Sequence, residues 1–184
     1  MNDDDRRRIP SVRFLIDANR INSNGQLQNM NILERWRKDK VITIMIPQAA
    51  QDEAAHGSRD RARKAYGYIL TMTKSRPEDK TLLNTIENIL FPQGATTQNE
   101  KNDIEIVFNA RKYGCQLVTN DGGSRRQPGG ILGNHDRLGQ LGIEVLTDEE
   151  AVTLIKQRIQ ERDNRERERC NSNGQPLPEW VGRD

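Results

Sequence analysis

NDIEIVFNARKYGCQLVTND, residues 102–121, is the stretch around which the rest of the chain is organised. It predicts a helix opened by Asp103, because apolar side chains recur at the spacing of one helix face. Gly114 stands where helices end in a left-handed residue, and a short buried strand follows through Thr119. Asp121 comes just past that strand. In an α/β sheet, a polar residue at such a place lies where ligands bind.

Other apolar runs predict further strands, at residues 12–17, 41–46 and 143–146. Together with residues 116–119 they give about four strands, separated along the chain by segments with helical periodicity. Strands that alternate with helices indicate a parallel sheet covered on both faces. The predicted fold class is therefore α/β, in three layers (α/β/α).

Helices are expected at residues 26–39, 59–73, 78–90 and from 148 to about 162, with a charged continuation towards residue 169. The predicted organisation has three parts. Residues 1–11 form a flexible charged tail, and residues 12–158 form the main domain, with a helical insertion around 58–92. Residues 159–184 form a charged helix extension and tail, in which Trp180 is expected to dock on this or another chain.

Composition limits the kind of protein. Hydrophobic residues make up 33% of the 184 residues and charged residues 30%, which predicts a modest core and a heavily charged exterior. Cys115 and Cys170 share no metal-ligand spacing, which favours a reducing compartment. No apolar run approaches the length of a membrane span or a signal peptide. We therefore expect a soluble cytoplasmic protein.

Acidic side chains follow the predicted strands at one edge of the sheet. Asp17 ends the first strand, Asp121 follows the third, Glu53 lies on the helix after the second, and Asp103 opens the helix at residues 102–113. Unpaired carboxylates that lie together repel one another, and a divalent cation removes that cost. Oxygen ligands without a Cys or His pattern select Mg²⁺ or Mn²⁺. Such an ion can activate water for attack on phosphorus.

These acids, taken in order, resemble the pattern of PIN domains. LIDAN at 15–19 resembles the opening motif, and Glu53, NDIEIVFNA and LVTND supply the remaining acids at similar spacing. GIEVLTDEEAV at 142–152 resembles the last strand and helix of that family. The resemblance covers roughly residues 12–158. The segments at 58–100 and 122–134 are longer than in the smallest members.

The resemblance implies a metal-dependent endoribonuclease, and many PIN domains are toxins of toxin–antitoxin pairs. It implies that Asp17, Glu53, Asp103 and Asp121 bind Mg²⁺ or Mn²⁺ or activate water. It further implies that Thr119 steadies a carboxylate or a water molecule and that Asn19 has a structural role. An RNA substrate, an antitoxin protein and a homodimer are the implied partners.

Each acid also has a purely structural interpretation. Asp17 and Asp121 are common turn residues, and Asp103 suits a helix cap. Asp52 and Glu53 are adjacent, so only one of them can face the site. Asp136 is read as a helix cap before it is read as a fifth acid. His56 and His135 have no partner pattern and are expected at the surface.

Basic residues near the predicted site are candidates for contact with RNA phosphates: Arg59, Arg61, Lys64, Arg125 and Arg126. The alternative function is a PIN-like module that binds RNA or protein without cleaving. The clustered acids weigh against it, because a pure RNA-binding surface gains nothing from negative charge. A phosphatase with an aspartyl nucleophile is disfavoured, because Asn19 stands where such enzymes have a second acid.

Overall fold

The structure is a computed structural model that describes residues 6–9, 12–72, 75–122 and 129–184. Its centre is a parallel sheet with the strand order β3-β2-β1-β4-β5. The middle strand, β1, is fully buried at Phe14, Leu15 and Ile16, as expected for a strand covered on both faces. The strands are β1 Arg13–Ile16, β2 Thr43–Pro47, β3 Ile69–Thr71, β4 Gln116–Val118 and β5 Val145–Leu146.

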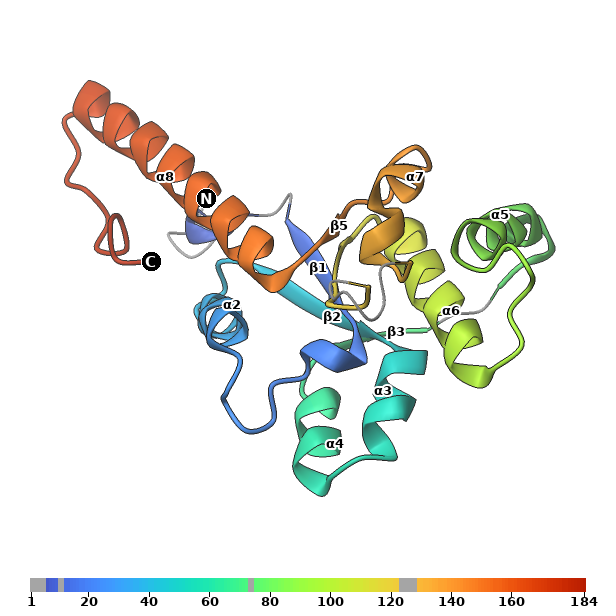
Figure 1. The fold of residues 1–184 in the computed structure, drawn as a ribbon. Coiled ribbons are helices and arrows are strands. Elements are labelled where there is room, and N and C mark those ends of the chain that lie inside the picture. The colour runs from blue at the N-terminus through green and yellow to red at the C-terminus, as the bar shows by residue number, and fades with distance from the viewer. Residues whose placement is uncertain (1–5, 10–11, 73–74, 123–128) are drawn as a thin grey trace.

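Helices cover both faces of the sheet (Figure 1). On one side α2 packs against α8, and on the other α6 contacts β2 and β4 while α5 lies outside it. The α/β/α prediction is confirmed. The helices are α2 Gln28–Lys38, α3 Gln48–Ala55, α4 Arg59–Tyr66, α5 Lys80–Leu90, α6 Gln98–Tyr113, α7 His135–Gly139 and α8 Asp148–Asn173.

None of the helices in the described residues has the length and apolar character to cross a membrane.

The sheet has one strand more than the sequence predicted. The helix expected at 59–73 ends at Tyr66, and β3 follows at the edge of the sheet, paired with β2. Gly67 interrupts the helix, and β-branched Ile69 and Thr71 suit an extended edge strand. Helical periodicity does not describe this segment, because the apolar Ile69 and Leu70 are exposed whereas Thr71 is buried.

Helix α6 begins earlier than predicted. Thr97 is its N-cap and forms a capping box with Glu100, so Gln98 is the first helical residue. Asp103 therefore lies in the second turn of the helix and does not cap it. The predicted stop is confirmed, since Gly114 adopts the left-handed conformation with φ 59°.

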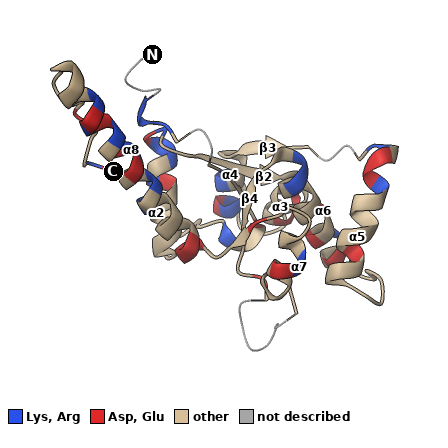
Figure 2. Cartoon of the chain, turned by 90° about the horizontal axis from the view of Figure 1, so that it is seen from above, with Lys and Arg blue, Asp and Glu red and all other residues tan. Residues whose placement is uncertain are grey.

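The last helix is longer than expected. Thr147 and Glu150 form a capping box at its start, and α8 runs through to Asn173, beyond the continuation expected towards residue 169. Charges of both signs line it (Figure 2), and both ends of the described chain lie beside it (Figure 1). We call this assembly the terminal clamp; its members are Arg6, Arg7, Arg162, Asp163, Glu166, Arg169, Trp180 and Asp184.

The expected docking of Trp180 occurs within the chain itself. The guanidinium carbon of Arg162 lies 4.6 Å from the centroid of the Trp180 ring. The division of the chain at residue 158 stays a prediction, although α8 continues through that point without a break.

Candidate functional site

The sheet provides a crevice at the carboxyl ends of β1 and β4. From β1 the chain builds β2 and β3 on one side, and later β4 and β5 on the other. Neighbouring strands whose connections leave in opposite directions open a gap beyond their carboxyl ends, where α/β proteins bind ligands. Asp17 follows β1 and Asp121 follows β4 at this gap.

Asp17 is held in place by side chains that the sequence also singled out. Its Oδ2 accepts hydrogen bonds from Thr119 Oγ1 at 2.7 Å and from Asn19 Nδ2 at 2.6 Å. Only 5% of Asp17 is exposed, and Thr119 is fully buried. The hydroxyl and amide therefore fix the orientation of a buried carboxylate.

Asp121 is held by the returning end of the loop that follows β4. Its Oδ2 accepts a hydrogen bond from the Ile131 N–H at 2.8 Å, and its own N–H donates to Thr119 Oγ1 at 3.0 Å. Gly130 lies so close that a Cβ there would overlap the Asp121 carboxylate. A plain Asp-Gly turn would not require these contacts.

Asp103 projects from the second turn of α6, where a capping role is excluded by the earlier helix start. Its pKa is raised from the ordinary 3.8 to about 8, chiefly by burial and then by the charges of Asp121, Asp17, Glu53 and Glu100 in that order. These contributions show that the four predicted acids act on one another through space.

Asp17 responds to the same neighbours. Its pKa is raised from 3.8 to about 6: burial is the largest cause, the hydrogen bond from Thr119 opposes it, and the charges of Glu53 and Asp121 add to the increase. Within the part of the chain that the structure describes, no Lys or Arg forms an ion pair with Asp17, Asp103 or Asp121. Among the described residues, these three carboxylates therefore lack a compensating basic side chain.

Glu53, and not Asp52, belongs to this group. Glu53 raises the pKa of both Asp17 and Asp103, whereas Asp52 contributes to neither. Asp52 instead accepts a hydrogen bond from Gln48 Nε2 at 2.7 Å. Arg61 Nη2 lies 3.6 Å from a Glu53 oxygen.

The four acids do not already form a coordination shell. Among the described residues, no group of three or more His, Cys, Asp or Glu side chains is arranged so that it could hold a metal ion. The acids are therefore close enough to perturb one another but not close enough to share one ion in these positions. Like charges without a cation between them are expected to stay apart.

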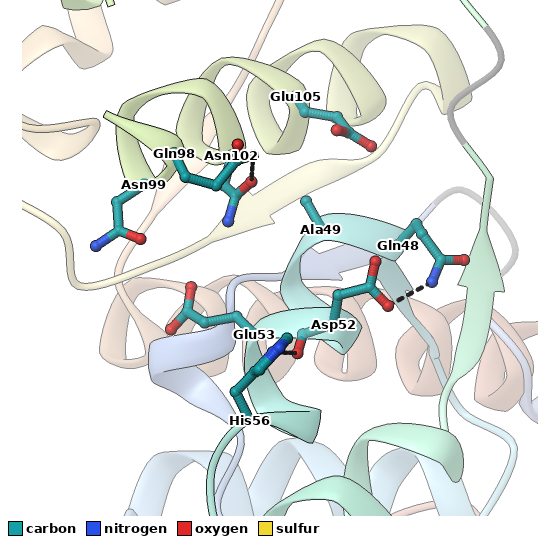
Figure 3. A pocket seen from close by; sticks show the side chains of 9 residues that line it. All are labelled: Gln48, Ala49, Asp52, Glu53, His56, Gln98, Asn99, Asn102 and Glu105. Carbon is teal, nitrogen blue, oxygen red and sulfur yellow. Dashed lines mark hydrogen bonds between the residues drawn. The ribbon is translucent and has the colours of Figure 1, made fainter. Parts of the chain in front are cut away.

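Two pockets open on either side of the first turns of α6. One, of about 420 Å³, is lined by Asp103 and Asp121 together with Leu90, Phe91, Asn99, Glu100, Gly129, Gly130 and Ile131. The other, of about 410 Å³, lies between α3 and α6 (Figure 3) and is lined by Gln48, Ala49, Asp52, Glu53, His56, Gln98, Asn99, Asn102 and Glu105. Asn99 lines both pockets.

The sequence reasoning missed the amide side chains of these pockets. The sequence predicts this helix only from residue 102, so it does not place Gln98 and Asn99 on a helix facing α3. The T-x-x-E signal at Thr97 and Glu100 would have placed them there.

The basic residues predicted to bind RNA have different surroundings. Arg59 is exposed. Arg61 donates to the Ala18 carbonyl at 2.8 Å, and Lys64 pairs with Glu34 at 2.6 Å, so both also hold the fold together. Arg125 and Arg126 lie outside the described residues.

The remaining candidates are outside the acidic group. His56 Nδ1 lies 2.7 Å from the Asp52 carbonyl oxygen, and His135 Nδ1 lies 2.9 Å from that of Leu132. Both histidines are exposed, as expected. Asp136 is in the first turn of α7, with its side chain 90% exposed and against His135.

No protein-family model matches the sequence, and a search of curated proteins finds no match. Among solved structures, the chain is similar to VapBC2 from Rickettsia felis bound to a DNA fragment from its promoter. The sequence identity is 18%, over 74% of this chain and 98% of that chain, with a TM-score of 0.46.

It is also similar to a PilT N-terminus domain protein from the archaeon Sulfolobus solfataricus. Here the identity is 12%, over 78% of this chain and 93% of that chain, with a TM-score of 0.45. Both similarities are similarities of fold alone.

Proposed function

We propose that this protein is a metal-dependent endoribonuclease that hydrolyses RNA phosphodiester bonds at the group formed by Asp17, Glu53, Asp103 and Asp121. One observation carries the proposal. Four carboxylates from separate segments act on one another at the crevice of a parallel sheet, and the pKa values of two are raised to about 6 and about 8. An arrangement that costs stability is expected where a site serves chemistry.

The donor chemistry of the group fits Mg²⁺ or Mn²⁺. All four acids offer hard oxygen ligands. Asp17, Glu53, Asp103 and Asp121 are the residues that would hold the ion. When bound, such a cation neutralises the carboxylates, polarises a phosphate oxygen and lowers the pKa of water.

The chain itself supplies orientation. Thr119 and Asn19 fix Oδ2 of Asp17, and the Ile131 N–H fixes Oδ2 of Asp121. Thr119 links the two acids, because its hydroxyl donates to Asp17 and accepts from the Asp121 N–H. The orientations of the Asp17 and Asp121 carboxylates are therefore fixed before any ligand binds.

The RNA strand would cross the crevice between the two pockets beside α6. The wall of the 420 Å³ pocket includes Phe91, Leu90 and Ile131, which suit a base stacked on an apolar surface. Arg59, which is exposed, is the basic residue that we propose contacts a phosphate. An antitoxin protein and a second copy of the chain remain predicted partners.

The test is cleavage of single-stranded and structured RNAs by the wild type and Asp121→Asn, in Mn²⁺, Mg²⁺ or EDTA. We expect metal-dependent cleavage that falls about a hundredfold or more in the variant, since even outer partners of metal ligands cost about 10- to 100-fold. Asp136→Asn is the matched control, because Asp136 is an exposed acid outside the group.

Circular dichroism of all three proteins shows whether any loss reflects unfolding. Equal cleavage by wild type and Asp121→Asn would contradict the assignment of the site. RNA binding without cleavage in either metal would favour the alternative, a module that binds RNA or protein.

A further inference from the structure

We propose that the pocket between α3 and α6 binds a guanine base of the RNA, next to the nucleotide whose phosphate is cleaved. This inference rests on the proposed function for its biological substrate, but the pocket itself defines the ligand. It is about 410 Å³ in volume, and its lining side chains come from the facing sides of two helices (Figure 3).

The charges of the pocket exclude a phosphate group. Its lining includes the carboxylates Asp52, Glu53 and Glu105 and no Lys or Arg. An anion placed there would be repelled. A group that donates hydrogen bonds would be attracted, so the base end of a nucleotide fits where the phosphate end does not.

Several polar groups in the pocket are already oriented by their neighbours. Gln48 Nε2 donates to Asp52 Oδ1 at 2.7 Å, and Gln98 Nε2 donates to Asn102 Oδ1 at 2.9 Å. These bonds leave Asp52 Oδ2 as an acceptor and both hydrogens of Asn102 Nδ2 as donors. The half-buried Glu105 carboxylate accepts no hydrogen bond from any other described residue.

The pocket thus offers paired acceptors on a carboxylate and a separate amide donor. Guanine is the base that matches, because its Watson–Crick edge presents two neighbouring donors, N1–H and the N2 amine, beside the O6 acceptor. Glu105 would accept from both donors and Asn102 would donate to O6. Adenine, cytosine and uracil each present a single donor group on that edge.

The position of the pocket connects it to the acidic group. Glu53 lines the pocket, and its charge acts on Asp17 and Asp103. Glu53 and Asn99 lie at the same end of the pocket (Figure 3), and Asn99 also lines the pocket of Asp103 and Asp121. A base held between α3 and α6 is therefore adjacent to the crevice, as single-stranded RNA recognition requires.

The test is NMR titration of the full chain in EDTA with GMP, IMP, AMP, CMP and UMP, following the side-chain amide signals of Gln48, Gln98, Asn99 and Asn102. All five ligands carry the same phosphate, so differences report the base. We expect GMP to shift these signals and IMP, which lacks the N2 amine, to bind about tenfold more weakly.

Glu105→Gln should reduce GMP affinity to about that of IMP, whereas Glu149→Gln, an exposed acid on α8, should leave it unchanged. Equal shifts with all five nucleotides, or none, would overturn the inference. Shifts with free arginine but not with GMP would overturn it in favour of a cationic peptide.

Nucleotide binding is measured without catalysis, so the proposal of a guanine pocket and the proposal of a nuclease can each be contradicted without the other. Selective GMP binding without RNA cleavage would leave the guanine pocket standing and remove the nuclease. RNA cleavage that is equally fast beside guanosine and beside inosine would leave the nuclease standing and remove the guanine pocket.

Discussion

The acidic group and the terminal clamp both contain buried carboxylates, but the clamp pairs them with arginines whereas the acidic group surrounds them with other acids. In the clamp, Arg162 Nη2 lies 2.6 Å from Asp163 and 2.9 Å from Asp184, and all of these side chains are at least 93% buried. In the crevice, Asp17 is equally buried and its charged neighbours are acids. Both regions thus bury carboxylates, and they differ in the sign of the charge on the neighbouring side chains.

The pKa values record this difference. Burial alone would raise the pKa of Asp184, but hydrogen bonds from Arg7 and Arg162 outweigh it and hold that pKa below its ordinary value. For Asp17 and Asp103, burial and neighbouring acids act in the same direction. The clamp carboxylates therefore stabilise the fold when charged, whereas the crevice carboxylates destabilise it. Only the second kind gains from a bound cation.

Breaking the clamp is expected to have the largest effect. Arg162→Ala removes the partner of Asp163 and Asp184 and the cation over Trp180. Leaving buried charges uncompensated costs about 3–5 kcal/mol, which urea unfolding would measure. Arg158→Ala, which removes an exposed pair with Glu161, should cost about 1 kcal/mol or less. Equal losses in the two variants would show that the clamp is not a buried network.

Stability should vary with pH in a way that separates the two regions. The folded-state pKa values of Asp17 and Asp103, about 6 and about 8, exceed their ordinary value of 3.8. Between these values the folded protein binds protons that the unfolded chain does not, so stability in EDTA rises as pH falls from about 8 to about 5. Asp17 alone contributes up to about 3 kcal/mol.

The clamp predicts the opposite trend in acid. The pKa values of Asp184 and Glu166 are lowered, so the unfolded chain takes up protons first and stability falls below about pH 4. Urea unfolding across this range should therefore give a maximum near pH 5. Stability that rises steadily from pH 5 to pH 8 would contradict the assignment of raised pKa values to the crevice.

The contact at Gly130 sharpens the account of Asp121. Gly130→Ala places a Cβ against the Asp121 carboxylate, and such overpacking costs about 1–3 kcal/mol or displaces the acid. Gly129→Ala is the matched control, because nothing lies within 4 Å of a Cβ there. We expect Gly130→Ala to lose Mn²⁺-induced thermal stabilisation that Gly129→Ala keeps. Equal behaviour would mean that the Gly130 contact does not position Asp121.

Two of the acids could be identified as site candidates from the sequence because their local sequence marks the end of a strand. Asp17 and Asp121 follow short apolar runs, and a strand end can be recognised from its neighbours alone. The choice between Asp52 and Glu53 could not be made in this way, because it depends on how α3 is rotated against α6. In the structure, the charge of Glu53 and not that of Asp52 raises the pKa of Asp17 and Asp103, which favours Glu53.

The clamp shows the limit of local reasoning. Arg162 Nη1 donates to the carbonyl of Arg7, 155 residues away, at 2.6 Å. A run of alternating charges near the end of a chain is most simply read as a solvated helix, and nothing within the run identifies the tail that covers it. Strand β3 was not predicted because it also depends on a distant segment. It is defined by its pairing with β2 and not by the periodicity of its own residues.

The central claim is that the crevice acids repel one another until a divalent cation joins them. The most direct measurement is thermal unfolding of the wild type and Asp103→Asn at about pH 8, first in EDTA and then in Mn²⁺. In EDTA we expect Asp103→Asn to be the more stable, by about 0.5–2 kcal/mol, because the substitution removes one repelling charge. In Mn²⁺ we expect the wild type to be stabilised more than the variant. The difference in stability between the two proteins should therefore shrink or change sign. If Asp103→Asn is less stable in EDTA and Mn²⁺ shifts both proteins equally, the acids are not a metal site.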